Sequence, residues 1–255
     1  VPMFSPALGG LIETHYGWQG TFFVLASLGS IMLALSYFDQ GETAPASEHS
    51  ILGQFQNYPL LLTSKRFWGY CLASAFGSGS FFAYLGGAPA VGADVYALDP
   101  QTVGLFLGAP AFGYFFGNFI AGRYSKSIGI DLMVLYGLSL ALCGMTLSFI
   151  ISGLGYGSAF SFFGFMTFVG LGNGMSIPNA TAGMLAIKPE LAGTASGLGS
   201  AMMIGGGAAL SALAGPVLQI GTGDLALIAL MWVSIFIGIL FILLVIRRNR
   251  TLHLE

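Results

Sequence analysis

Three asparagines lie within otherwise apolar stretches, where an amide side chain must find a partner. Asn173 and Asn179 stand on either side of Pro178 in one stretch, and Asn118 lies in another. Because Pro178 has no backbone N–H, it frees the carbonyl four residues earlier. Such freed backbone is tolerated at membrane depth where protein or a water-filled cavity satisfies it. The three amides therefore either form hydrogen bonds between helices or face the path of a substrate.

Aromatic and methionine side chains in the same apolar stretches could line a cavity for an amphiphilic ligand. Phe82 and Tyr84 belong to an aromatic-rich stretch, and Met203 follows another methionine further along the chain. Methionine is flexible and polarizable, and it adapts to ligands of different shape. The alternative is that these side chains contact lipid or the protein core. We keep the three residues, with the three asparagines, as candidates for a substrate path.

The patterns of common catalytic sites are absent from the sequence. It contains no His-Glu-x-x-His, no Gly-x-Ser-x-Gly and no Walker A pattern. Cys71 and Cys143 each stand alone in an apolar stretch, without metal or disulfide spacing. No ionisable residue lies in the middle of a long apolar stretch, which is where a proton relay usually needs one. We therefore expect no enzyme, no metal, no cofactor and no nucleic-acid partner.

The composition is that of a membrane protein with several spans. Charged residues make up 7% of the chain and hydrophobic residues 55%, and the mean hydropathy is +0.83. Soluble domains carry about 25% charged residues. A helix of about 20 apolar residues crosses the hydrocarbon core of a bilayer. Stretches long enough to cross are 20–38, 67–91, 102–122, 132–152, 158–184, 194–219 and 225–246.

The basic residues predict the orientation of these spans. They form four groups: Lys65 with Arg66, Arg123 with Lys126, Lys188 alone, and Arg247 with Arg248 and Arg250. If the spans alternate in direction, all four groups fall on one side, which the positive-inside rule makes the cytoplasmic side. Residues 124–130 and the tail after Arg247 are then cytoplasmic, and residues 92–101 are outside.

Small residues recur every four positions along one span, in a set that we call the α-stripe. Its members are Gly193, Gly197, Ala201, Gly205 and Ala209. Such a pattern allows a neighbouring helix to approach closely. Shorter versions are Gly113 with Gly117 and Gly170 with Gly174. Each pattern serves either plain packing or a contact along which helices slide.

These observations predict an all-α membrane protein in four parts. Residues 1–38 hold the last part of one helix and one complete helix at the end of a helical half. Residues 39–66 form a cytoplasmic linker. Residues 67–246 form a six-helix transmembrane bundle, and residues 247–255 form a cytoplasmic tail.

One motif near the start resembles that of a known transporter family. Pro6, Gly9 and Gly10 match the antiporter motif that closes the fifth helix in the major facilitator superfamily, where Ser5 replaces the first glycine of the motif. Within that superfamily the chain most resembles the drug:proton antiporters of the Bcr/CflA type.

Further motifs follow in the order in which the family has them. Gly122 and Arg123 with Gly129 resemble the second copy of the family's cytoplasmic hairpin signature, although its acidic residue is missing. Pro178-Asn179 and the segment from Ala192 to Ser196 resemble the tenth and eleventh helices. The resemblance covers nearly the whole chain.

The resemblance implies the C-terminal part of a twelve-helix transporter, beginning near the end of the fifth helix. Substrate would bind near the midplane between two six-helix halves that rock against each other. The family implies proton-coupled efflux of amphiphilic drugs across the bacterial inner membrane, with protons handled by the missing N-terminal half. The alternatives are a sugar or metabolite transporter of the same superfamily, and a nonfunctional fragment or membrane scaffold.

Overall fold

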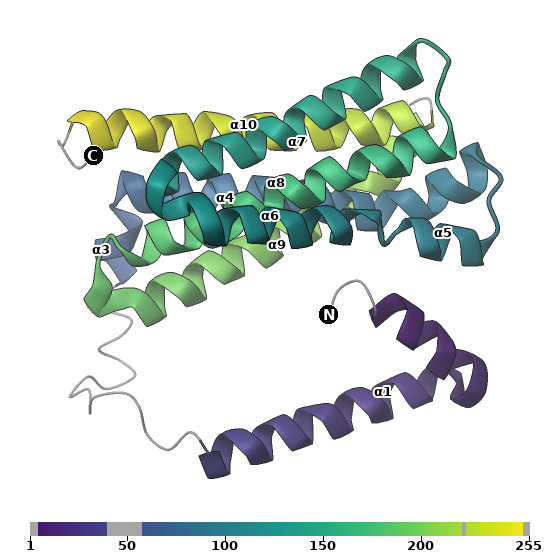
Figure 1. Cartoon of the computed structure of the whole chain (residues 1–255), viewed down its shortest axis with the longest axis horizontal. Coiled ribbons are helices and arrows are strands. Elements are labelled where there is room, and N and C mark those ends of the chain that lie inside the picture. The colour runs from purple at the N-terminus through teal and green to yellow at the C-terminus, as the bar shows by residue number, and fades with distance from the viewer. Residues whose placement is uncertain (1–4, 40–57, 221–222, 252–255) are drawn as a thin grey trace. The chain divides into compact units, whose positions relative to one another are not determined.

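The computed structural model describes residues 5–39, 58–220 and 223–251, and of residues 5–11 and 13–15 it describes the backbone alone. The chain divides into two units, Val1–Gln56 and Asn57–Glu255. All regular secondary structure in the described residues is helical (Figure 1). The predicted all-α fold class is therefore confirmed.

The described residues of the first unit form one helix, α1 (Ser5–Asp39), which is broken at Gly17. Gly17 has φ 67° and ψ 177°, a conformation that glycine reaches without steric cost. The break falls within the polar stretch of residues 13–19. It separates the antiporter-motif residues from a second segment, Tyr16–Asp39, that is long and apolar enough to cross a membrane. The side chains of the motif lie outside the described residues.

The second unit is built from six long helices among its described residues, as the sequence predicts. They are α4 (Lys65–Ala90), α6 (Ala109–Ile128), α7 (Ile130–Gly153), α8 (Ala159–Leu185), α9 (Ala192–Ile220) and α10 (Asp224–Thr251). Short elements are α3 (Tyr58–Leu62), η1 (Val91–Val95), α5 (Pro100–Phe106) and η2 (Pro189–Leu191). The basic residues at the chain end belong to α10, whose helix extends beyond the predicted span.

Helices α8 and α4 hold the bundle together. Helix α8 packs against α6, α7 and α4, while α4 also packs against α9 and α10. The two short glycine pairs meet at the α6–α8 contact. A Cβ atom added to Gly113 would lie 1.9 Å from the backbone oxygen of Thr167, and one on Gly170 would lie 1.8 Å from that of Pro110. No side chain fits there, so the glycines fix how closely α6 and α8 approach.

The α-stripe lies on the exposed side of α9, away from its own bundle. All five members are exposed, and a Cβ atom on Gly193, Gly197 or Gly205 would meet nothing within 4 Å. The inward side of α9 carries Gly207 instead, where a Cβ atom would lie 2.3 Å from Phe82. No helix of the described bundle therefore packs on the α-stripe. A packing role for the α-stripe stays a prediction, and it requires a partner helix outside this bundle.

Helix α4 is long enough to span but more polar than its neighbours. It has 26 residues, yet it is not among the segments whose hydropathy qualifies them as membrane spans. Its buried side carries Ser74, Ser78 and Ser80 as well as glycines. Each of these hydroxyls donates to a carbonyl three residues earlier in the helix. The polarity of α4 is thus satisfied inside the bundle.

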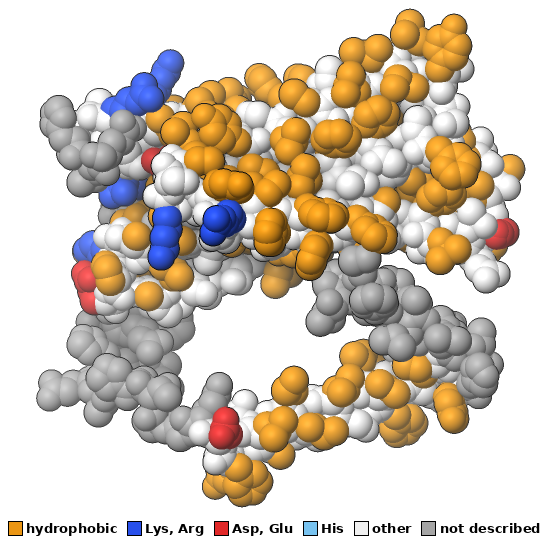
Figure 2. Space-filling model, in the orientation of Figure 1, with side chains coloured by type: hydrophobic (Ala, Val, Ile, Leu, Met, Phe, Trp, Pro, Cys, Tyr) orange, Lys and Arg blue, Asp and Glu red, His pale blue; other side chains and the backbone are white. Residues whose placement is uncertain are grey.

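The basic residues of the bundle gather at one end, together with the acids Asp131 and Glu190, and the charged residues described at the other end are acidic. The eight Lys and Arg residues lie near the start of α4, the end of α6, the segment after α8 and the end of α10. Those visible in Figure 2 gather at one end. Asp94, Asp99 and Asp224 lie at the other end, where α4, α6, α8 and α10 have their opposite termini. The predicted alternation of helix direction brings the four basic groups together.

Candidate functional site at the basic end of the bundle

A pocket of about 830 Å³ opens at the basic end of the second unit. Helices α4, α6, α7, α8 and α10 all contribute to its wall. Its polar lining includes Arg66, Lys126, Asp131, Asn179 and Asn249. Both charge signs and two amides thus surround one cavity.

The carboxylate of Asp131 is the centre of a hydrogen-bonded cluster in this pocket. The hydroxyl of Tyr70, on α4, donates to Oδ1 of Asp131, on α7. The amide Nδ2 of Asn249, on α10, donates to Oδ2 at 2.6 Å and lies 3.4 Å from the Tyr70 oxygen. Tyr70 is 3% exposed and Asn249 5%. We call these residues the Asp131 cluster, and it joins three helices at one end of the bundle.

Two buried polar atoms, one in the Asp131 cluster and one on another residue of the pocket lining, have no partner within the described residues. They are Oδ1 of Asn249 and Nε of Arg66. One is an acceptor and the other a donor, and both residues line the pocket. A buried polar group gains free energy when it forms its missing hydrogen bond. The wall of the pocket thus holds one donor and one acceptor whose hydrogen bonds are unformed within the described residues.

Gly129 places Asp131 by joining α6 directly to α7. Its φ of 93° and ψ of 150° end α6, and its N–H donates to the carbonyl of Ser125. Asp131 then falls in the first turn of α7, where the helix dipole favours a negative charge. Gly129 lines the pocket, whereas Gly122 and Arg123 are exposed and do not.

The three asparagines predicted from the sequence lie in different surroundings. Asn179 is buried in the pocket wall, and Asn118 lies on α6. Each donates to a carbonyl of its own helix four residues earlier, Asn179 to Met175 at 2.7 Å and Asn118 to Tyr114 at 2.8 Å. Asn173 is buried where α8 meets Gly77 of α4. Of these amides, Asn179 is the one that lines the pocket.

The aromatic candidates and Met203 lie away from this pocket. Tyr84 is fully buried, its ring 6.2 Å from that of Phe163, and its hydroxyl donates to the carbonyl of Phe106 at 3.2 Å. Phe82 packs on Gly207 of α9, and Met203 is half-buried on the same helix. Tyr84 is therefore part of the core, and a substrate-path role for Phe82 and Met203 stays a prediction.

A second polar cluster closes the opposite end of the bundle. Oδ2 of Asp224 accepts hydrogen bonds from the hydroxyls of Tyr96 at 2.7 Å and Ser152 at 2.6 Å. These residues join the turn after η1 to α7 and α10. Burial raises the pKa of Tyr96, and the Asp224 carboxylate raises it further. The phenol therefore stays protonated and continues to donate beyond the pH at which a free tyrosine loses its proton. We call this set the Asp224 cluster.

Sequence comparison relates the chain to membrane transporters. The sequence pattern of the Major Facilitator Superfamily matches residues 1–212. The bicyclomycin resistance protein homolog of Haemophilus influenzae is 28% identical over 216 residues, and multidrug resistance protein D of Escherichia coli is 27% identical over 230 residues. The MFS-type transporter YdgK of Bacillus subtilis is 32% identical over 132 residues.

These matches cover more of this chain than of the relatives. They include 83%, 89% and 50% of this chain for the Haemophilus, Escherichia and Bacillus proteins, respectively. The corresponding shares of the relatives are 54%, 57% and 33%. The chain thus spans about half or less of the length of the curated relatives it matches.

Proposed function

Because this chain belongs to the major facilitator superfamily, we propose that it works in a transporter that exports amphiphilic compounds in exchange for protons. The family match and the similarity to bicyclomycin- and multidrug-resistance proteins confirm the resemblance that the motifs indicated. The family match over residues 1–212 carries the proposal. The names of the relatives support drug-like substrates, and their bacterial origin is consistent with the bacterial inner membrane as the location.

In this proposal the six-helix bundle, residues 67–246, is one of two halves that rock around a substrate. Residues 1–38 belong to the other half, residues 39–66 connect the halves on the cytoplasmic side, and residues 247–255 form the tail. The division of the chain into Val1–Gln56 and Asn57–Glu255 supports this arrangement. Transporters built from such repeats bind substrate at the interface between them.

The pocket at the basic end belongs to the cytoplasmic entrance of the substrate path in this proposal. Its volume of about 830 Å³ is within the range of small-molecule sites. The Asp131 cluster holds the ends of α4, α7 and α10 together while the halves rock. Asn179, in the same wall, contributes to the choice of substrate.

Proton coupling depends on residues outside these spans. Among the described residues of the bundle, the acidic and basic side chains lie near helix ends or in turns. A group that binds and releases protons during transport usually lies within the membrane. We therefore place the coupling residue in the other half of the transporter.

The experiment is a dye-efflux assay in bacterial cells that lack their own pumps and express the full reading frame that contains this chain. We expect reduced ethidium accumulation and loss of this protection when a protonophore is added. Asn179→Ala should change which compounds are exported while the protein level stays constant. Ser127→Ala, exposed on the same end, is the matched control.

Two results would contradict the proposal. Accumulation of several cationic and neutral drugs that is unchanged by well-expressed protein in the membrane would exclude drug export. Uptake of radiolabelled sugars by the same cells would assign the chain to the sugar or metabolite transporters of the superfamily.

A further inference from the structure

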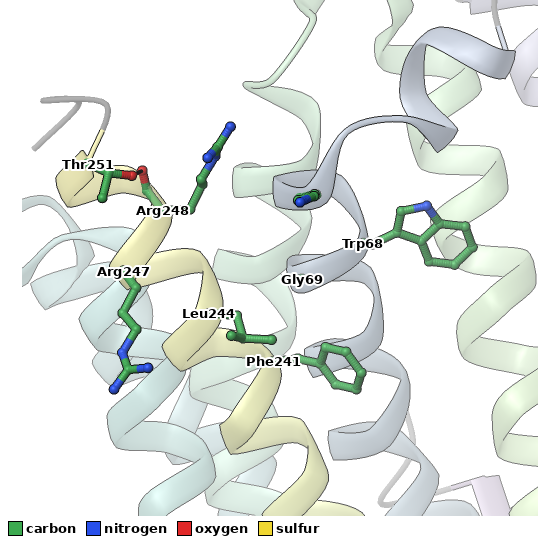
Figure 3. A pocket seen from close by; sticks show the side chains of 8 residues that line it. Trp68, Gly69, Phe241, Leu244, Arg247, Arg248 and Thr251 are labelled. Carbon is green, nitrogen blue, oxygen red and sulfur yellow. Dashed lines mark hydrogen bonds between the residues drawn. The ribbon is translucent and has the colours of Figure 1, made fainter.

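A second pocket, of about 470 Å³, lies between α4 and α10 at the basic end, and we call it the α4–α10 groove (Figure 3). Its lining combines two kinds of side chain. Lys65, Arg247 and Arg248 are cationic and exposed, whereas Trp68, Phe241 and Leu244 are apolar. The groove is thus positively charged at the helix ends and apolar further along the helices.

Close packing of two helices forms the floor of the groove. A Cβ atom on Gly69 of α4 would lie 2.1 Å from Cγ2 of Val245 on α10, whose side chain is buried. Because Gly69 has no side chain, α10 approaches α4 closely there. Phe241 and Leu244, on α10, lie beside this contact in Figure 3.

The apolar walls are held in place by neighbouring groups. The indole Nε1 of Trp68 donates to the carbonyl of Leu62 at 2.7 Å, which fixes the ring near the start of α4. The ring of Phe241 stacks on that of Phe76, with centroids 6.0 Å apart and an interplanar angle of 9°. Tryptophan at the end of a membrane helix is typical of the interface between lipid headgroups and hydrocarbon. From this preference we expect the groove to lie at the depth where a headgroup meets its acyl chains.

The cations sit at the headgroup end of this arrangement. Lys65 begins α4, and Arg248 lies in the last turn of α10. Figure 3 shows Arg248 at the end of α10, while Arg247 extends along another side of that helix. An arginine can form two parallel hydrogen bonds to a phosphate group, and a lysine adds a point charge. Lys65 and Arg248 are thus suited to a phosphate, and Arg247 adds to the positive potential.

We propose that the α4–α10 groove binds an anionic phospholipid of the bilayer, with its phosphate at Lys65 and Arg248 and an acyl chain against Trp68, Phe241 and Leu244. Charge complementarity identifies the headgroup, because basic pockets between membrane helices recognise anionic lipids. The apolar walls select a lipid over a free phosphate, which would leave them without a partner. The bound lipid would bridge the ends of α4 and α10. The proposal is independent of which compound the transporter carries.

The experiment measures contact between Trp68 and lipid by fluorescence quenching. The full chain is reconstituted into phosphatidylcholine vesicles with Trp18→Phe and Trp232→Phe, so that Trp68 is the remaining tryptophan of the three in the sequence. A small fraction of lipid with brominated acyl chains is added, either as phosphatidylglycerol or as phosphatidylcholine. We expect brominated phosphatidylglycerol to quench Trp68 at a much lower mole fraction than brominated phosphatidylcholine.

Matched charge variants test the role of the cations. Lys65→Gln with Arg248→Gln should lower the apparent affinity for phosphatidylglycerol by roughly twenty-five-fold, given about one fivefold step for each cation near an anionic surface. Lys126→Gln with Lys188→Gln removes the same charge from the same end of the bundle but outside the groove, and it should leave the quenching unchanged. If the first variant does not fold, the single substitutions Lys65→Gln and Arg248→Gln give the same test, each with an expected loss of about fivefold against the single control Lys188→Gln.

Three results would overturn the proposal. Equal quenching by the two brominated lipids would show no preference for an anionic headgroup. Equal loss in both charge variants would show that the membrane surface as a whole is attracted and not the groove. Displacement of brominated phosphatidylglycerol by millimolar inorganic phosphate would assign the site to a free phosphate.

Discussion

Asp131 is the residue on which the contacts at the basic end converge. Its two carboxylate oxygens accept hydrogen bonds from Tyr70 and Asn249, which are separated from it by 61 and 118 positions in the sequence. No local spacing could identify these partners, because the bundle topology brings them together. The sequence did predict the asparagines in apolar stretches, and Asn118 and Asn179 each donate a hydrogen bond to a carbonyl of their own helix.

Replacement of Asp131 by asparagine should destabilise the bundle. Hydrogen bonds to a charged group contribute about 1.5–3 kcal/mol each. The NH2 group of the new asparagine side chain would also replace an accepting oxygen by a donor, where Tyr70 and Asn249 both donate. We expect a loss of about 2 kcal/mol, seen as a lower midpoint of thermal unfolding in detergent. Asp94→Asn, at an exposed acid on the other end, is the control. Equal midpoints for the two variants would show that the Asp131 cluster does not stabilise the bundle.

The Asp224 cluster predicts how stability depends on alkaline pH. The pKa of Tyr96 is raised in the folded protein above the value of about 10 for an unfolded chain. The folded state therefore holds this proton more tightly, and the resulting stability is present below pH 10 and is lost as the pH rises above it. Tyr96→Phe should lower the unfolding midpoint at pH 7 and reduce the further loss between pH 9.5 and pH 11.

The control for this pH experiment is Tyr156→Phe, because the Tyr156 side chain is 78% exposed. It should retain the pH dependence of the parent protein. If Tyr96→Phe and Tyr156→Phe follow the same pH profile, Tyr96 does not cause the alkaline loss.

At the scale of helices, length and hydropathy predicted most elements, and side-chain spacing predicted their contacts less well. All six bundle helices occur where apolar stretches of spanning length were found. In lipid, the backbone N–H and C=O groups of such a stretch must form hydrogen bonds with each other, and a helix provides them all. The glycine pairs on α6 and α8 do meet. The longer α-stripe does not face its own bundle. A pattern of small residues predicts that a helix can pack closely there, but it does not predict which helix.

Two leucine substitutions separate these glycine patterns. Gly113→Leu forces α6 away from α8, because the new Cβ atom would lie 1.9 Å from a backbone oxygen that cannot move aside. We expect a loss of about 3 kcal/mol or more. Gly197→Leu meets open space within its bundle and should be nearly neutral for unfolding of the chain alone. The measurement is the unfolding midpoint in detergent, and a larger loss for Gly197→Leu would place a packed helix against the stripe.

At the scale of the whole molecule, the bundle agrees with the expectation that consecutive helices alternate in direction. The sequence placed four basic groups on one side by counting spans, and the structure brings these groups to one end of the bundle. This count includes α4 as an apolar stretch of spanning length, although its mean hydropathy is below that of the segments that qualify as membrane spans. Its glycines and serines are inside the bundle, so its tertiary position explains a composition that looks weak in isolation.

The orientation of the bundle in the membrane is open to direct measurement. The positive-inside rule places the basic end in the cytoplasm, because cytoplasmic loops retain Lys and Arg. Single cysteines would replace Ser127, between α6 and α7, and Gln101, at the opposite end, in a background with Cys71→Ala and Cys143→Ala. Both sites are exposed. With a membrane-impermeant thiol reagent, intact cells should be labelled at position 101, and position 127 should react after permeabilisation. Labelling at 127 and not at 101 in intact cells would invert the topology, and it would place the α4–α10 groove and the Asp131 cluster on the outer side.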